Sequence, residues 1–137
     1  MGKVYKHATV TAQVIGAFYT VYNTLGYGFL EKVYEHALGI ELQQQGVEAV
    51  RQQPIRVFYA GQVVGEYFAD MLVANAVLVE LKATRTLAPE HEAQLLNYLR
   101  ATKVEVGLLL NFGPKPQIKR FAYENSRKGK RVRTQKE

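Results

Sequence analysis

The stretch that most constrains the fold covers residues 65–83, GEYFADMLVANAVLVELKA. Side chains two apart share one face of a β-strand, and the alternation here predicts two strands that fold back on each other about Asn75. Asp70 and Glu80 lie equally far from Asn75, so antiparallel pairing places them roughly opposite each other on the face that Lys82 also shares. Because facing like charges destabilise a strand pair, we expect a cation between the two carboxylates.

A hard divalent cation would neutralise this cluster better than Lys82 alone. The expected ligands are the carboxylate oxygens of Asp70 and Glu80 and the backbone carbonyl of Leu81. Oxygen ligands with room for water favour Mg²⁺ or Mn²⁺ over Zn²⁺. The alternative is a solvated sheet face, on which a Glu–Lys pair contributes little to stability.

The length of 137 residues fits one domain with a proper core. There are no cysteines, which excludes disulfides and thiolate chemistry. The first residues, MGKVYKHATV, lack an apolar core of signal-peptide length, and no apolar run approaches membrane-spanning length. We therefore expect a cytoplasmic protein.

Positive charge is concentrated at the C-terminal end. Residues 115–137 carry nine Lys or Arg against two Glu, whereas residues 1–114 sum to −1 within a net charge of +6. Apolar residues nearly vanish after residue 124, so we predict a domain over residues 1–124 and a disordered basic tail over 125–137. Such a tail either attracts a polyanion or only solubilises the chain.

The remaining periodicities predict an α/β fold with a mixed central sheet. Apolar spacing indicates helices over residues 8–25, from 28 or 29 to 45, and 89–102. In the second helix the expected buried side includes Leu30 and Val33. A strand from Pro54, the two strands about Asn75, an apolar run over 104–112 and an edge strand over 117–123 complete the order helix, helix, three strands, helix, two strands. The strand–helix–strand passage predicts one parallel pair within the sheet.

Two other places have polar side chains that could act with this pair. Glu31 lies near the start of the second helix, where a lone Glu is more often only solvated. Gln94 and Tyr98 are one turn apart on the third helix, on a polar stripe that either faces solvent or orients a phosphate or attacking water. There is no phosphate-binding Gly-rich loop, no dinucleotide fingerprint and no HExxH, and the only serine, Ser126, lies in the tail.

Four short motifs in order resemble one known family. Residues 28–34, GFLEKVY, resemble the signature of the GxxExxY proteins, which are placed in the PD-(D/E)XK nuclease superfamily. Phe68-Ala69-Asp70 and Val79-Glu80-Leu81-Lys82-Ala83 are similar to the superfamily's acidic motifs. Residues 94–98, QLLNY, look like the Gln-x-x-x-Tyr motif of RecB-type exonucleases. Ala69 stands where the superfamily motif has Pro.

The resemblance implies a restriction-endonuclease-like core and a Mg²⁺-dependent nuclease, for which Mn²⁺ substitutes. Asp70 and Glu80 would bind the metal with Leu81 and Glu31, Lys82 would position or activate water, and Gln94 and Tyr98 would support them. DNA is favoured over RNA as the substrate. Because a domain this small has little surface outside its catalytic face to grip a duplex, we also expect a homodimer. The alternative is a catalytically inactive nucleic-acid- or partner-binding module on the same fold. The basic residues expected to contact a phosphate backbone are Lys119, Arg120, Arg127, Lys128, Lys130, Arg131 and Arg133.

Overall fold

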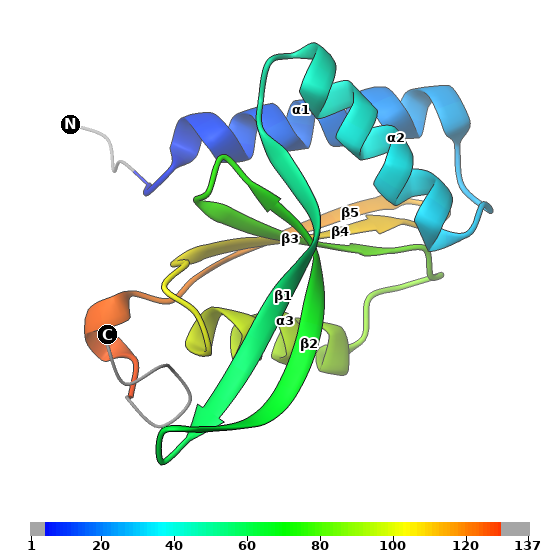
Figure 1. Ribbon diagram of the computed structural model, residues 1–137. Helices are drawn as coiled ribbons and strands as arrows, with labels where there is room; N and C mark the ends of the chain where they lie inside the picture. Colours follow the sequence, from blue (N-terminus) through cyan, green and yellow to red (C-terminus); the bar gives the residue numbers. More distant parts are fainter. Residues whose placement is uncertain (1–4, 130–137) are drawn as a thin grey trace.

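The computed structural model describes residues 5–129, which form three α-helices, five strands and one short 3₁₀ helix (Figure 1). The order of elements is the predicted one. The elements are α1 (Ala8–Leu25), α2 (Glu31–Gln44), β1 (Ala49–Tyr59), β2 (Gln62–Val73), β3 (Val77–Lys82), α3 (Pro89–Arg100), β4 (Val106–Phe112), β5 (Pro116–Ala122) and η1 (Asn125–Arg127).

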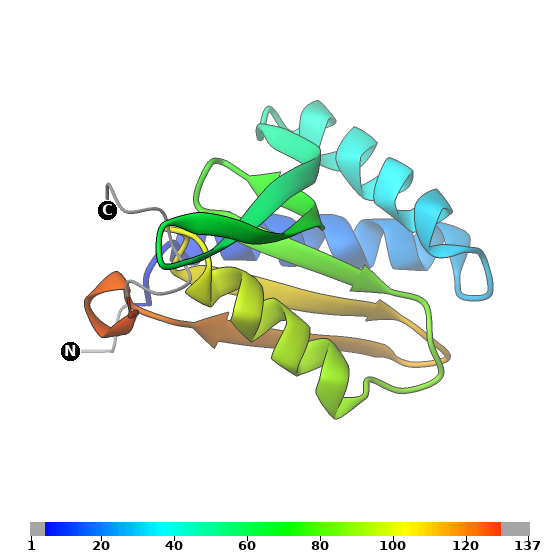
Figure 2. The same ribbon diagram turned by 60° about the horizontal axis from the view of Figure 1, so that its bottom comes forward.

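The five strands make one mixed sheet in the order β1-β2-β3-β4-β5. Three neighbouring pairs are antiparallel, and β3 with β4 is the parallel pair that α3 connects. Helices α1 and α2 cover one face of the sheet and α3 covers the other (Figures 1 and 2). The prediction of an α/β fold with a mixed central sheet flanked by helices is confirmed.

Two apolar clusters hold these layers together. One lies under α1 and α2 and includes Phe18, Leu38 and Val79, whereas the other lies under α3 and includes Leu78 and Leu99. Each fully buried apolar side chain of this size stabilises the fold by roughly 1.5–3 kcal/mol. Successive side chains of a strand point to opposite faces, so even-numbered positions of β3 lie on the α3 side.

The starts of β1 and α2 differ from the predicted ones. β1 begins at Ala49, five residues before Pro54, because β1 is an edge strand where a residue without an N–H group is tolerated. α2 begins at Glu31, after a loop that precedes it. As a result Leu30 is 79 % exposed and Val33 is 39 % exposed, so their predicted burial is wrong. The buried positions of α2 are Tyr34, Glu35, Leu38 and Leu42.

The domain extends past residue 124. Asn125–Arg127 form a turn of 3₁₀ helix, and the Asn125 backbone N–H donates to Glu105 Oε2 at 2.7 Å. Lys128 is 7 % exposed and its Nζ donates to the carbonyls of Thr102 and Val104. Disorder predicted from residue 125 is therefore wrong for residues 125–129, because these contacts close the C-terminal end of α3. The rest of the predicted tail, residues 130–137, lies outside the described residues.

None of the helices within residues 5–129 combines the length and apolar character that crossing a lipid bilayer requires.

Candidate active site

The hairpin of β2 and β3 is symmetric about Asn75, as the sequence predicts. Ala74 and Asn75 both adopt positive φ angles, 50° and 53°, which suit a tight hairpin turn. Met71 pairs with Val79, and the ladder between the two strands ends there. Beyond this pair β2 stays with β1 and β3 stays with β4, so the strands diverge at Asp70 and Glu80.

Where β2 and β3 diverge, carboxylate side chains take the place of backbone carbonyls as hydrogen-bond acceptors. The Asp70 backbone N–H donates to Glu80 Oε2 at 2.8 Å, and the Leu81 backbone N–H donates to Asp70 Oδ2 at 2.8 Å. Each carboxylate thus satisfies an N–H group that the separating strands would otherwise leave unpaired. Asp70 and Glu80 are held together by these reciprocal bonds.

Burial and neighbouring negative charges make both carboxyl groups hard to ionise. The pKa of Glu80 is raised to about 8, first by burial and then by the charge of Asp70. The pKa of Asp70 is also raised, mainly by burial, against the lowering effect of the bond from Leu81. A nearby cation reverses this cost because it stabilises the charged forms.

The donor set fits a hard divalent cation. Asp70 and Glu80 each use one oxygen for a backbone N–H group, and the other oxygen has no hydrogen-bond partner within residues 5–129. Across those residues the only buried side-chain N or O atom without a partner is Arg120 Nε, so both free oxygens reach solvent. Oxygen ligands open to solvent are what Mg²⁺ and Mn²⁺ require.

Lys82 brings a positive charge to this pair. It lies two residues after Glu80 and is half-buried, and its charge lowers the pKa of both Asp70 and Glu80. Lys82 forms no salt bridge or side-chain hydrogen bond within the described part of the chain. Its ammonium group is therefore available to a bound substrate or water.

Glu31 is not assembled with the pair. It is exposed at the first residue of α2, and its charge raises the pKa of Asp70 and Glu80. Across residues 5–129, however, no three Asp, Glu, His or Cys side chains lie close enough together to hold a metal ion. Of the three carboxylates predicted to bind a metal, the structure brings Asp70 and Glu80 together and does not bring Glu31 into a group with them.

A second acid on α2 was not identified from the sequence. Glu35 is 3 % exposed and accepts from Arg51 Nε at 3.0 Å, from Gln52 Nε2 at 2.9 Å and from Lys32 Nζ at 3.3 Å. Its charge also raises the pKa of Asp70. The signal available was its position one helical turn after Glu31. Arg51 and Gln52 tie α2 to β1, and the charges of Arg51 and Lys32 neutralise Glu35.

Tyr34 fixes the loop that leads to Glu31. Its hydroxyl donates to the Gly26 carbonyl at 2.8 Å and accepts from the Phe29 N–H at 3.2 Å. Its ring is fully buried and stacks on Phe112, with centroids 4.2 Å apart. The Tyr of the GFLEKVY motif thus holds the loop at Gly26 and Phe29, and Glu31 lies where this loop becomes a helix.

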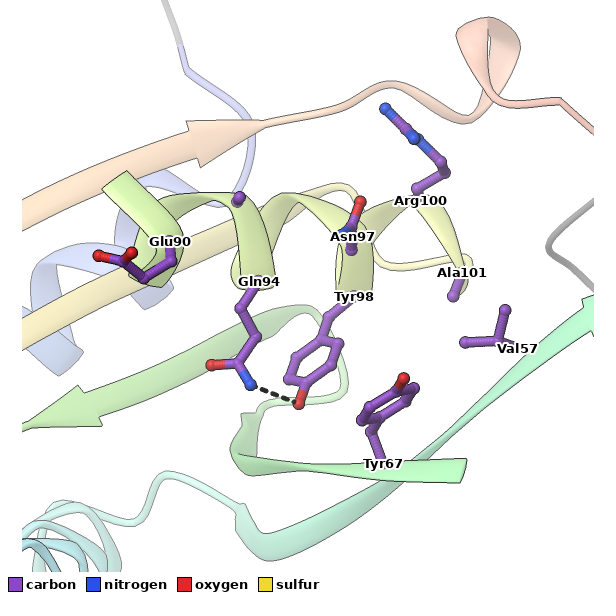
Figure 3. Close-up of a pocket in the computed structure, with 9 residues that line it drawn as sticks. Val57, Tyr67, Glu90, Gln94, Asn97, Tyr98, Arg100 and Ala101 are labelled. Atoms are coloured by element: carbon purple, nitrogen blue, oxygen red, sulfur yellow. Dashed lines mark hydrogen bonds between the residues drawn. The ribbon is translucent and has the colours of Figure 1, made fainter. Parts of the chain in front are cut away.

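Tyr98 and Gln94 lie on the side of the sheet that α3 covers. Gln94 Nε2 donates to the Tyr98 hydroxyl at 3.1 Å (Figure 3). The pKa of Tyr98 is raised to about 12 by burial and then by the charges of Glu80 and Asp70, so its hydroxyl stays protonated. The alternative in which the polar stripe faces solvent is wrong for Tyr98, because it is 5 % exposed and packs with Leu95 and Leu99 in the cluster under α3.

Asn111 and Gln117 hold the chain that follows Lys82, which no pattern in the sequence indicates. Asn111 accepts from the Thr84 N–H at 3.0 Å and donates to the Thr84 carbonyl at 2.9 Å. Gln117 Oε1 accepts from Asn111 Nδ2 and from the Leu87 N–H. Because Asn111 pairs with Lys82 in the sheet, these bonds fix the exit of β3 beside the carboxylate pair.

The basic residues predicted to contact a phosphate backbone differ in their contacts within the protein. Lys119 pairs with Glu92, and Arg120 donates to the Lys6 carbonyl at 2.9 Å, so both have intramolecular partners. Arg127 is exposed. Lys128 is buried against two carbonyls, so its predicted contact with a phosphate backbone is wrong. Lys130, Arg131 and Arg133 lie outside the described residues.

Comparison with protein families gives one match, in which the model of the PD-(D/E)XK nuclease superfamily covers residues 8–121. No curated protein and no solved structure matches the chain. The matched range begins with α1 and ends within β5, so it includes every element that contributes to the carboxylate pair.

Proposed function

Because the chain belongs to the PD-(D/E)XK nuclease superfamily, we propose that it is a divalent-metal-dependent nuclease that hydrolyses phosphodiester bonds in DNA. The observation that carries this proposal is the reciprocal pair of Asp70 and Glu80 at the divergence of β2 and β3, with Lys82 two residues on. Mg²⁺ is the proposed ion, with Mn²⁺ as a substitute, because the free donors are oxygens. The narrower likeness to GxxExxY proteins is supported by the loop that Tyr34 frames.

The proposed metal ligands are the free oxygens of Asp70 and Glu80 and the carbonyl of Leu81. When bound there, a divalent cation supplies charge neutralisation and an acidified water ligand. The reciprocal bonds from Asp70 N and Leu81 N hold both carboxylates in place before any ligand arrives, which limits the entropy lost on binding.

The other residues act through charge and orientation. Lys82 would hold the attacking water or a non-bridging phosphate oxygen by its unpaired ammonium group. Tyr98 keeps its proton near neutral pH, so together with Gln94 it can only donate to or orient a substrate oxygen, not remove a proton. Glu31 would hold water at the outer edge of the site.

The test is cleavage of plasmid and oligonucleotide DNA with and without Mg²⁺ or Mn²⁺. We expect metal-dependent cleavage that Glu80→Gln and Lys82→Ala each reduce by at least about 100-fold, the scale of lost charge stabilisation. Glu48→Gln, which changes an exposed acid between α2 and β1, should cleave as the unaltered chain does. Circular dichroism should show that all variants are folded.

Binding of DNA without turnover would instead support the inactive module, and cleavage of RNA alone would change the substrate class. A melting temperature that does not respond to millimolar Mg²⁺, in a chain that also lacks cleavage, would contradict the metal site. Cytoplasmic location and a homodimer remain predictions from the sequence.

A further inference from the structure

A groove separates α3 from the hairpin formed by β1 and β2. It has a volume of about 410 Å³, and Figure 3 shows its two walls. This volume is within the range of small-molecule sites. We call it the α3 groove; the residues used below are Val57 and Tyr67 on the hairpin and Gln94, Asn97, Tyr98 and Arg100 on α3.

The α3 groove adjoins the carboxylate pair through Tyr98. This side chain lines the groove and lies in the same apolar cluster as Leu78, whose face of β3 is shared by Glu80. The charges of Glu80 and Asp70 also raise its pKa. On β2, Tyr67 lies three residues before Asp70, so their Cα atoms are roughly 10 Å apart along the strand. A chain with one phosphate at Asp70 can therefore reach the groove with an adjacent nucleotide.

Tyr67 offers a fixed aromatic surface within this groove. It is 50 % exposed, and its ring centroid is 5.9 Å from that of Tyr98. A Cβ atom at Gly65 would lie 3.2 Å from Tyr67 Cε2, so the ring lies over the glycine. One side of the ring is thus supported by the protein, and the exposed half is free to stack on another flat group.

The opposite wall carries groups suited to the edge of a base. Gln94 and Asn97 have amide donors and acceptors, whereas the guanidinium of Arg100 points away from Tyr67 and lies 5.8 Å from the centroid of the Tyr123 ring (Figure 3). Val57 adds an apolar contact on the hairpin side. A flat apolar ring with polar edges and a neighbouring phosphate matches this combination.

We propose that the α3 groove holds one unpaired nucleobase, stacked on Tyr67, of the strand whose phosphate lies at Asp70 and Glu80. The substrate class is therefore single-stranded or locally unpaired nucleic acid. In a duplex the base faces are already stacked on their neighbours, and entry into the groove would require unstacking. The inference rests on the proposed function for the position of the phosphate.

The test measures binding separately from cleavage. Fluorescence anisotropy in EDTA gives the Kd of a labelled oligonucleotide, alone and annealed to its complement, at one fixed salt concentration. We expect tighter binding of the single strand, and about tenfold weaker binding of it by Tyr67→Ala, as loss of one base–aromatic stack predicts. Tyr67→Phe should retain the affinity because it retains the ring face.

The matched control is Tyr59→Ala, which removes another exposed tyrosine of the same hairpin that does not line the groove. An equal loss in Tyr59→Ala, an equal loss for the duplex, or no loss in Tyr67→Ala would overturn the inference. If the chain cleaves nucleic acid but its binding does not depend on Tyr67, the proposed base site is wrong and the proposed nuclease activity is supported. If binding depends on Tyr67 but no cleavage occurs, the proposed nuclease activity is wrong and the proposed base site is supported.

Discussion

At the candidate site, two carboxylate side chains accept hydrogen bonds that backbone carbonyls accept elsewhere in the sheet. Where β2 and β3 separate, the carboxylates of Asp70 and Glu80 accept N–H groups that no opposing carbonyl can reach. The same bonds hold two acids together in a half-buried place, and this arrangement raises the pKa of each. The position of Asp70 and Glu80 therefore depends on their carboxylate chemistry, on the hairpin register and on the divergence of the two strands.

Tyr34→Phe tests how one hydroxyl fixes the loop before Glu31. The substitution keeps the stack on Phe112 but removes the bonds to the Gly26 carbonyl and the Phe29 N–H. We expect the free energy of unfolding to fall by about 1–2 kcal/mol, since buried backbone groups lose their partner. Urea denaturation measures the change. Tyr27→Phe, which alters a 60 % exposed ring nearby, should leave stability unchanged, and equal stability of both variants would contradict the role of the hydroxyl.

At the scale of elements, the exit of β3 depends on a close approach between two loops. A Cβ atom at Gly113 would lie 2.3 Å from the Thr84 carbonyl oxygen and 2.9 Å from Asn111 Nδ2. The glycine therefore lets the loop after β4 pack against the loop after β3, which Asn111 also holds.

Gly113→Ala should destabilise the fold by about 2 kcal/mol or more, because backbone must move to admit the methyl group. Gly16→Ala provides the matched control. Gly16 lies inside α1, and nothing is within 4 Å of its would-be Cβ, so this change should stabilise the fold by about 0.5–1 kcal/mol. Thermal melts of both variants measure the difference, and a Gly113→Ala protein as stable as the unaltered chain would contradict the close approach.

Glu105 joins the start of β4 to η1 and to the N-terminal residues. It accepts from the Asn125 N–H and from Lys6 Nζ, and these bonds, the first above all, lower its pKa. The ionised form of Glu105 therefore stabilises the fold at pH values above its ordinary pKa of 4.5. This stabilisation is lost as the pH falls through the lowered pKa of the folded state.

Glu105→Gln should therefore lose about 1 kcal/mol of unfolding free energy at neutral pH, and the deficit should narrow as the pH falls below 4.5. Urea denaturation across this pH range measures it. Glu48→Gln, which alters an exposed acid, should show no such change with pH. A deficit independent of pH would show that the charge of Glu105 is not the cause.

At the scale of the whole molecule, the basic C-terminal segment divides into an anchored part and the residues after Gly129. Deleting residues 125–137 removes Lys128 from the Thr102 and Val104 carbonyls and Asn125 from Glu105. Deleting residues 130–137 removes four basic side chains and leaves those contacts in place.

We therefore expect only the longer deletion to lower the melting temperature. The shorter deletion should weaken DNA binding and flatten its salt dependence, since fewer counterions are released from the phosphate backbone. Anisotropy titrations at several salt concentrations measure this slope. An unchanged slope would mean that these four residues only solubilise the chain.

Local spacing in the sequence determined the order of elements and the pairing of Asp70 with Glu80, because periodicity and hairpin register depend on residues close in the chain. The tertiary structure decided matters that depend on contacts between distant segments. These were the burial of Tyr98 and Lys128, the separation of Glu31 from the carboxylate pair, and the support of Thr84 by Asn111. A side chain's partner across the fold is set by packing of whole layers, which no short window of sequence contains.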